Sequence, residues 1–182
     1  PTTSASVTAK TLTVTGITAN NRVYDATTDA HDQLVTSSAA LSGVVNGDAV
    51  SLSVAGINGT FASKTVGNSK PITITGITIS GTDADNYALT QPSTTANITL
   101  KTLTVTGISA NNKVYNGSTT AALTTTNAAF VGIQGNDNVA LDLGSISGTF
   151  ANANVNIGTA VAIAGITATG TDASNYAITQ PT

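Results

Sequence analysis

The residues best suited to chemistry in this sequence are a single histidine and a set of aspartates. His31 is the only histidine, cysteine is absent, and all nine acidic residues are aspartate. The sequence therefore contains almost none of the residues needed for a histidine-based triad, a thiol nucleophile or a pair of catalytic glutamates. His31 also has no counterpart in the second half of the chain, so we interpret it as an exposed loop residue. We expect no enzyme.

The best candidates for a metal site are the oxygen-bearing side chains of one turn. Asp83, Asp85 and Asn86 lie close together in sequence, and calcium prefers such oxygen ligands. The related turn later in the chain carries Ser174 where Asp85 stands, and neither turn has the frame of an EF-hand. Calcium is therefore one interpretation. The one we favour is that these side chains cap the turns before Tyr87 and Tyr176.

Six aromatic side chains recur at matching places, although aromatic residues make up only 4% of the chain. We expect them to anchor the cores, with the tyrosine hydroxyls reaching backbone partners at strand ends. Binding of a sugar on exposed tyrosines is the alternative. The six residues are Tyr24, Phe61, Tyr87, Tyr115, Phe150 and Tyr176.

The elements that position these side chains are duplicated. Residues 10–17 return unchanged as 101–108, and residues 81–88 return as 170–177 with a single substitution. The spacing between matching residues is 91 at the start and 89 later, so the second copy is two residues shorter; we place the loss in a variable loop between Tyr24 and Gly43. The sequence predicts two modules, residues 1–91 and 92–182.

Each module is dominated by alternation of apolar and polar residues, which predicts half-buried strands. The pattern occurs six times, and it usually continues through a glycine to an isoleucine that is out of phase, as at a β-bulge. The one segment suited to a helix is 28–41, with Asp29 as a possible N-cap; its counterpart is 119–130. The six segments are residues 12–17, 52–57, 72–77, 103–108, 141–146 and 161–166.

The charge balance excludes some partners. The sequence pI is about 4.6, with only six lysines and arginines, whereas nucleic-acid binding needs a basic surface. No apolar run approaches the roughly 20 residues of a membrane span. We therefore expect no nucleic acid and no membrane span.

The junction between the copies predicts how they connect. Apolar residues occupy alternate positions on both sides of Lys10 and of Lys101, and the alternation shifts by one residue at each lysine. This pattern suggests a strand that runs through each junction with a kink and makes a stiff connection. The strand at 92–100 could complete the first module, and the spare strand at 4–9 could then fill the second module of another molecule, giving head-to-tail chains. Because methionine is absent, we expect a segment of a longer array.

The order of these motifs resembles the YDG repeat, which is related to the MBG repeats. The resemblance rests on residues 20–25, the Gly59-Thr60-Phe61 run and residues 81–87, each with its second copy. The tripeptide that names the family is Tyr24-Asp25-Ala26 in one copy and Tyr115-Asn116-Gly117 in the other. The family implies repeats of filamentous-haemagglutinin-like bacterial surface proteins and adhesins, and it brings no catalytic residues.

The sequence thus predicts an all-β protein of two tandem, small, immunoglobulin-like β-sandwiches that form a rod. The alternative is a pair of β-grasp-like modules, each with one short helix. We expect a stalk or fibre segment of a secreted protein at the bacterial surface, with neighbouring repeats as partners and without cofactors. Loop-mediated adhesion to a glycan or a host or cell-surface protein, with or without calcium, is the alternative.

Overall fold

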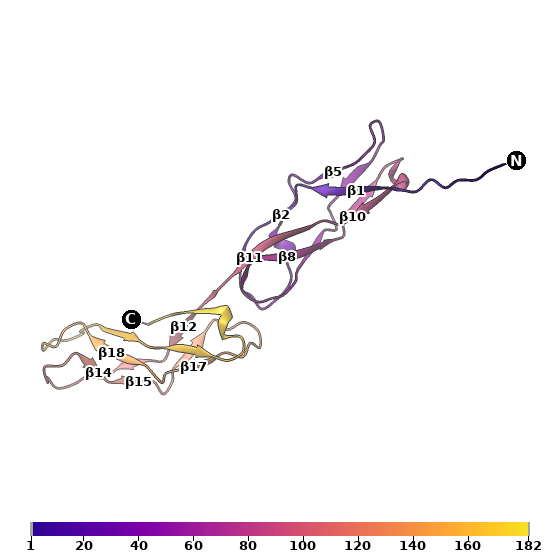
Figure 1. The fold of residues 1–182 in the computed structure, drawn as a ribbon. Coiled ribbons are helices and arrows are strands. Elements are labelled where there is room, and N and C mark those ends of the chain that lie inside the picture. Colours follow the sequence, from indigo (N-terminus) through magenta and orange to yellow (C-terminus); the bar gives the residue numbers. More distant parts are fainter. Residues whose placement is uncertain (1, 182) are drawn as a thin grey trace. The chain divides into compact units, whose positions relative to one another are not determined.

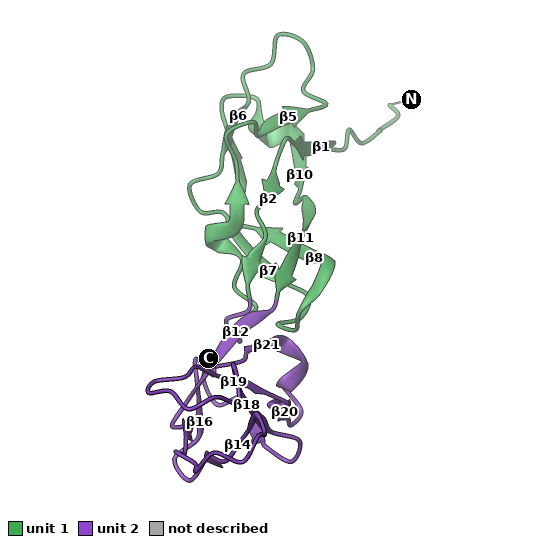
Figure 2. Ribbon diagram, turned by 90° about the vertical axis from the view of Figure 1, so that its left-hand side faces the viewer, with its two compact units in different colours: residues 1–23, 27–99 green, residues 24–26, 100–182 purple. Residues whose placement is uncertain are grey.

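The regular structure of the chain is nearly all β: short strands are joined by turns and loops (Figure 1). The computed structural model describes residues 2–181. The chain divides into two compact units: unit 1 comprises the chain up to Val23 together with Thr27–Thr99, and unit 2 comprises Tyr24–Ala26 and the chain from Leu100 onward (Figure 2). Within residues 2–181, no helix has the length and apolar character needed to cross a membrane.

Unit 1 is built on two main sheets. One has the order β10-β1-β5 and the other β3-β11-β8-β7, and two short ribbons pair β2 with β4 and β6 with β9. The strands are β1 (Lys10–Thr15), β2 (Thr18–Ala19), β3 (Arg22–Val23), β4 (Leu34–Val35), β5 (Ala40–Ser42), β6 (Ser51–Ser53), β7 (Asn58–Phe61), β8 (Gly67–Thr75), β9 (Thr78–Ser80), β10 (Tyr87–Thr90) and β11 (Ser93–Thr99).

The core of unit 1 follows from the alternation in its strands. Leu12 of β1, Ile72 and Ile74 of β8, and Ile98 of β11 are all at most 1% exposed, while the threonines between them face solvent. Strand β8 is central, since its residues from Ile72 to Thr75 pair with β7 and its residues from Gly67 to Thr73 pair with β11. Strand β11 also carries β3 on its other side.

Unit 2 repeats most of this plan with shorter strands. Its sheets have the orders β16-β12-β21 and β14-β18-β19, with ribbons of β13 with β15 and β17 with β20. The strands are β12 (Lys101–Thr106), β13 (Ser109–Ala110), β14 (Thr120–Ala121), β15 (Leu123–Thr124), β16 (Ala129–Val131), β17 (Ala140–Asp142), β18 (Ser147–Phe150), β19 (Val161–Ala164), β20 (Thr167–Thr169) and β21 (Tyr176–Thr179).

The units differ at one place in this plan. Strand β19 corresponds to β8 but has only four residues against nine, and among residues 2–181 it pairs with β18 alone. The residues that correspond to β3, Lys113 and Val114, form no strand. Both losses have one cause. In unit 1, strand β3 and the first residues of β8 pair only with β11. Among its described residues, unit 2 has no strand that corresponds to β11.

The glycines of the repeated pattern explain its one exception. Gly76 and Gly165 follow β8 and β19 with φ of 78° and 81°, and a Cβ on either would lie about 2 Å from a backbone oxygen. Gly56, in contrast, has no positive φ. Its counterpart Ser145 therefore meets no backbone strain, which accounts for serine at a position that elsewhere holds glycine.

The helix expected over residues 28–41 is wrong. The segment holds a single 3-10 turn, η1 (His31–Gln33), followed by β4 and β5, and residues 119–130 hold β14, β15 and most of β16. Asp29 is not a helix cap; its carboxylate accepts the His31 N–H at 2.9 Å. Two other 3-10 turns, η2 (Ala84–Asn86) and η3 (Ala173–Asn175), precede β10 and β21. The β-grasp alternative, which required a helix in each module, is therefore not supported within residues 2–181.

The two lysines expected at kinks each begin a strand. Lys10 opens β1 opposite Tyr87, and Lys101 opens β12 opposite Tyr176. Strand β11 ends at Thr99, so Leu100 interrupts the strand that was expected to run through the junction. Residues 2–9, which precede Lys10 as residues 93–100 precede Lys101, are exposed and form no strand.

Candidate interaction site

The strongest polar cluster in each unit joins an aspartate to a tyrosine. In unit 1 the Tyr87 hydroxyl donates to the Asp48 carboxylate at 2.6 Å and accepts the Val45 N–H at 2.9 Å. A turn closed by the Asp48 N–H on the Val45 carbonyl holds both partners. We call this cluster the tyrosine notch of unit 1; a hollow of about 400 Å³ lies beside it, lined by Val7 and Asp85 among others.

Unit 2 has the same notch, and in it a second tyrosine is bound. The Tyr176 hydroxyl donates to Asp137 at 2.7 Å and accepts the Gln134 N–H at 2.9 Å. The Tyr24 hydroxyl donates to the same Asp137 oxygen at 2.6 Å. The Tyr24 and Tyr176 rings meet edge to face, with centroids 5.4 Å apart, and Tyr24 is only 1% exposed. One carboxylate thus holds two phenols in unit 2.

The notch keeps its tyrosines protonated. Burial, with the hydrogen bond to Asp137 as a further cause, raises the pKa of Tyr176 to about 12, although the Gln134 N–H acts in the opposite direction. Burial and the same carboxylate hold the pKa of Tyr24 well above its usual value. In unit 1 the hydrogen bond to Asp48 is the first cause that raises the pKa of Tyr87. Each phenol therefore keeps its proton, and the hydrogen bond that it donates, at more alkaline pH than a free tyrosine would.

Tyr115 corresponds to Tyr24 and behaves differently. It is 61% exposed, and the adjoining Val114 is 89% exposed, so the expectation that Tyr115 anchors a core is wrong. The physical reason is the missing strand: β3 is held by β11 immediately before Tyr24, whereas Lys113 and Val114 have no such strand beside them in residues 2–181. The structure thus contains a filled notch in unit 2, an open notch in unit 1 and an exposed Tyr115.

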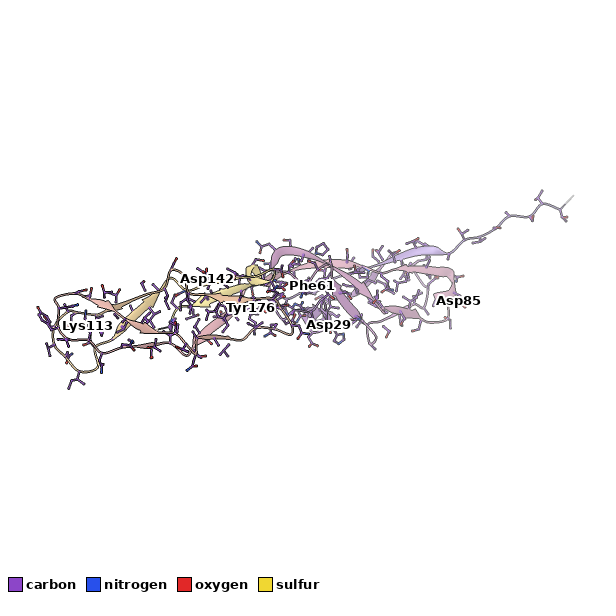
Figure 3. All side chains as sticks on the ribbon, turned by 90° about the horizontal axis from the view of Figure 1, so that it is seen from below. Asp29, Phe61, Asp85, Lys113, Asp142 and Tyr176 are labelled. Carbon is purple, nitrogen blue, oxygen red and sulfur yellow. The ribbon has the colours of Figure 1, made fainter. Side chains whose placement is uncertain are left out.

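The phenylalanines of the two copies each pack against a cation. Figure 3 shows Phe61 and Asp85 at opposite ends of unit 1, and Lys113, which contacts Phe150, far from Tyr176 in unit 2. In unit 1 the Arg22 guanidinium lies 4.7 Å from the centre of the Phe61 ring and donates to the carbonyls of Thr27 and Asp29. In unit 2 the Lys113 ammonium lies 5.3 Å from the Phe150 ring and donates to the Ser118 and Thr120 carbonyls. These cations brace the loop that follows each tyrosine. Phe61 is fully buried, but Phe150 is only half-buried.

The aspartate turns serve as backbone anchors. The Asp83 carboxylate accepts the Ala49 N–H at 2.8 Å, and Asp172 accepts the Asn138 N–H at 2.9 Å in the same way. Asp85 lies in η2 with its side chain exposed, and so does Asn86. Across residues 2–181, no three His, Cys, Asp or Glu side chains come together as metal ligands. Neither Asp83 nor Asp172 makes a side-chain hydrogen bond that caps its 3-10 turn, so the capping role expected for these turns is not found.

His31 lies where the two copies differ in length. Ala30 and Leu34 contact Gly59 just as Ala121 and Leu123 contact Gly148, so two of the three residues of η1 are the extra ones. The His31 Nδ1 lies 3.0 Å from the Ile57 carbonyl, and the side chain is exposed. The histidine thus belongs to a short surface insertion.

The residues that sequence reasoning missed are the two notch aspartates. Asp48 and Asp137 each precede their tyrosine by 39 residues, and this equal spacing in both copies was the available signal. The expected partner of the tyrosine hydroxyls was the backbone. The backbone N–H of Val45 or Gln134 is present, but the hydroxyl proton goes to a carboxylate.

Fold and site together define a tandem all-β repeat protein whose two units each contain an aspartate–tyrosine cluster of the same kind. A family model for the YDG domain matches residues 8–96 and 99–182, so the chain belongs to the YDG domain family. No curated protein and no solved structure gives a significant match to the chain.

Proposed function

We propose that the chain is a structural segment of a stalk or fibre in a large secreted bacterial surface protein or adhesin. Its membership of the YDG family, its duplication and its sheet-dominated structure support this role. We further propose that each unit is a small β-sandwich, since β1 and β8 both turn apolar faces into the core of unit 1. The role is non-catalytic and needs no cofactor.

One observation carries the proposal: the boundaries of the compact units do not coincide with the boundaries of the sequence repeats. Strand β11 opens the second repeat yet closes the sheet of unit 1, and Tyr24–Ala26 of the first repeat belong to unit 2. A chain whose repeats exchange segments in this way resists being pulled apart, because separation requires breaking a sheet or withdrawing a buried tyrosine. Resistance to tension is what a stalk must supply.

Single-molecule force spectroscopy on the full chain, pulled through its ends, tests this role. We expect two unfolding events, each releasing roughly 300 Å of chain, as follows from about 90 residues at full extension. Tyr24→Ala should lower the force of one event, and the matched variant Tyr115→Ala should leave both unchanged. Extension at forces no higher than those that stretch an unfolded chain would contradict a role in resisting tension.

A second candidate, loop-mediated adhesion to a glycan or protein, is favoured by a hollow of about 530 Å³ in unit 2. Exposed Tyr115, Val155 and Ile157 line it with asparagines between them. Aromatic and apolar side chains beside amides suit a carbohydrate or peptide ligand. Binding of the purified chain to a glycan array, abolished by Tyr115→Ala, would favour adhesion over the structural role.

A further inference from the structure

The turn that holds the tyrosine notch of unit 1 contains the pair Asn46-Gly47. Its ends are joined by the Asp48 N–H, which donates to the Val45 carbonyl at 3.1 Å. Asn46 and Gly47 are both exposed, and Gly47 has a φ of 97°. A Cβ built on Gly47 would meet nothing within 4 Å. The turn thus places a side-chain carboxamide directly before a residue whose backbone is unhindered.

An asparagine that precedes glycine can react with its own backbone. The Gly47 nitrogen, after losing its proton, attacks the Cγ of the Asn46 side chain; a C–N bond forms, and the carboxamide nitrogen takes up a proton and leaves as ammonia. Water then opens the five-membered imide at one of its two carbonyl carbons, which gives aspartate or isoaspartate at position 46. The attack requires the nitrogen to come within about 3–3.5 Å of Cγ, and glycine gives the backbone the freedom to reach that geometry.

Hydrogen bonding distinguishes this pair from the matching turn of unit 2. In the stretch that the structure describes, residues 2–181, no acceptor holds the Gly47 N–H. The turn of unit 2 has the reverse order, Gly135-Asn136. The nitrogen that follows its asparagine belongs to Asp137, whose N–H donates to the Gln134 carbonyl at 3.1 Å. The attacking nitrogen is therefore available in unit 1 and engaged in unit 2.

Burial distinguishes the same pair from a second asparagine–glycine pair in unit 1. Asn58-Gly59 begins strand β7, where Asn58 pairs with Thr75 of β8 and the Gly59 carbonyl accepts the Ala30 N–H at 2.9 Å. Gly59 is buried, and a Cβ on it would lie 3.1 Å from the Leu34 side chain. Because the backbone is held on both sides, the Gly59 nitrogen cannot turn toward the Asn58 side chain without breaking strand pairing.

We propose that the Asn46-Gly47 turn is a site of spontaneous deamidation that breaks the tyrosine notch of unit 1 and leaves the notch of unit 2 intact. Isoaspartate at position 46 adds a methylene to the main chain, which lengthens the ring closed by the hydrogen bond between Asp48 and Val45. The Val45 N–H and the Asp48 carboxylate then no longer meet at the Tyr87 hydroxyl. Either product also places a new negative charge two residues from Asp48. This modification goes beyond the proposed stalk role.

Peptide mapping by mass spectrometry of the full chain, incubated in mildly alkaline buffer, tests the site. Asn46 should convert at least about tenfold faster than Asn58 and Asn136. Its rate should rise with pH, because the Gly47 nitrogen must lose its proton before it attacks. Conversion of Asn58 or Asn136 as fast as that of Asn46 would overturn the proposal, and so would an Asn46 that stays intact while a free peptide of residues 44–49 converts.

A swap of the two residues provides the matched control. Asn46→Gly combined with Gly47→Asn gives unit 1 the order found in unit 2, where Tyr176 keeps both hydrogen bonds of its notch. The swapped chain should keep the unit 1 notch, and its asparagine should deamidate roughly tenfold more slowly than Asn46 of the native chain. Deamidation of the swapped chain at the native rate would show that the order of the turn does not control the reaction, and would overturn the proposal.

Amide hydrogen exchange before and after conversion measures the effect on the notch. A third asparagine–glycine pair, Asn116-Gly117, lies exposed in unit 2, so the samples carry Asn116→Gln to limit conversion to unit 1. The Val45 amide, which donates to the Tyr87 hydroxyl, should exchange roughly tenfold faster in the isoaspartate form, while the Gln134 amide should be unchanged. A Val45 amide as well protected after conversion as before would overturn the link between deamidation and the notch.

Discussion

The two units carry nearly the same sequence, yet unit 1 has a closed core and unit 2 has an open one. Phe61, Ile72 and Ile74 are buried in unit 1, whereas their counterparts Phe150, Val161 and Ile163 are only half-buried in unit 2. The substitutions between them are mild. The decisive difference is β11, which covers the unit 1 sheet and has no counterpart in unit 2 among residues 2–181. The sequence repeat is therefore not the unit that folds.

The notch shows the same contrast in reverse, since unit 2 has it filled by Tyr24 while the notch of unit 1 is open. Each unit thus lacks one component that the other possesses. The comparison teaches that a module of this kind needs a strand at one end and a tyrosine at the other, both supplied by sequence outside its own repeat.

The largest expected effect comes from removing the tyrosine that fills the unit 2 notch. Tyr24→Ala should destabilise unit 2 by about 3–5 kcal/mol, the range for truncating a fully buried aromatic residue. Urea unfolding followed through the amide NMR signals of each unit measures this separately from unit 1. The matched variant Tyr115→Ala should change either unit by less than about 0.5 kcal/mol in dilute solution. Equal effects of the two variants would contradict the contrast between a filled and an open notch.

The next effect comes from the closing strand of unit 1. Ile98→Ala should cost unit 1 about 2–5 kcal/mol, because it leaves a cavity beneath β8. Val7→Ala, at the corresponding place in the N-terminal segment, should have no measurable effect on a dilute sample. Thermal unfolding by circular dichroism compares the two. If Val7→Ala destabilised the dilute chain as much as Ile98→Ala, the N-terminal segment would be packed and our description of it wrong.

A smaller effect should distinguish a glycine with a positive φ from a glycine without one. Gly165→Ala introduces a Cβ about 2 Å from the Ser145 carbonyl oxygen at a φ of 81°, and we expect a loss of roughly 2 kcal/mol or more in unit 2. Gly56→Ser copies into unit 1 the residue that unit 2 tolerates, and it should cost less than about 1 kcal/mol. Urea midpoints of the two variants provide the measurement. A Gly56→Ser variant as unstable as Gly165→Ala would contradict the backbone explanation.

The smallest effect concerns alkaline pH. Because the folded pKa of Tyr176 is raised to about 12, unit 2 keeps its phenolic protons at a pH where the unfolded chain has released them. This contribution is therefore complete below about pH 10 and is lost as pH rises from there through the folded pKa. Unit 2, with Tyr24 and Tyr176 on one carboxylate, should lose stability more steeply than unit 1. Unfolding of each unit at about pH 9 and about pH 11 tests the order; an equal decline would contradict the shared carboxylate.

Much of this architecture follows from the sequence alone. The alternation of threonine with apolar residues predicted strands at all six repeated segments, and each of them begins in a strand. The helix expected over residues 28–41 failed because local composition said nothing of the bridge between Asp29 and Thr60 or of the pairing of β4 and β5 with strands of unit 1. Long-range pairing overrode a weak local propensity.

The site was harder to predict, because its members come from distant parts of the chain. Tyr24 and Asp137 are 113 residues apart, and no spacing within one repeat indicates that they meet. Matching residues were expected to play matching roles, and Tyr115 shows the limit of that reasoning. Its environment depends on a strand from the neighbouring repeat, which no comparison of single positions detects.

Hydrogen exchange at the amides of β19 tests most directly the claim that unit 2 has an open edge. In dilute solution, the N–H groups of β19 that face away from β18 should exchange rapidly, while the corresponding groups of β8, which face β11, should be strongly protected. Protection of these β19 amides in dilute solution, equal to that of β8, would contradict the account.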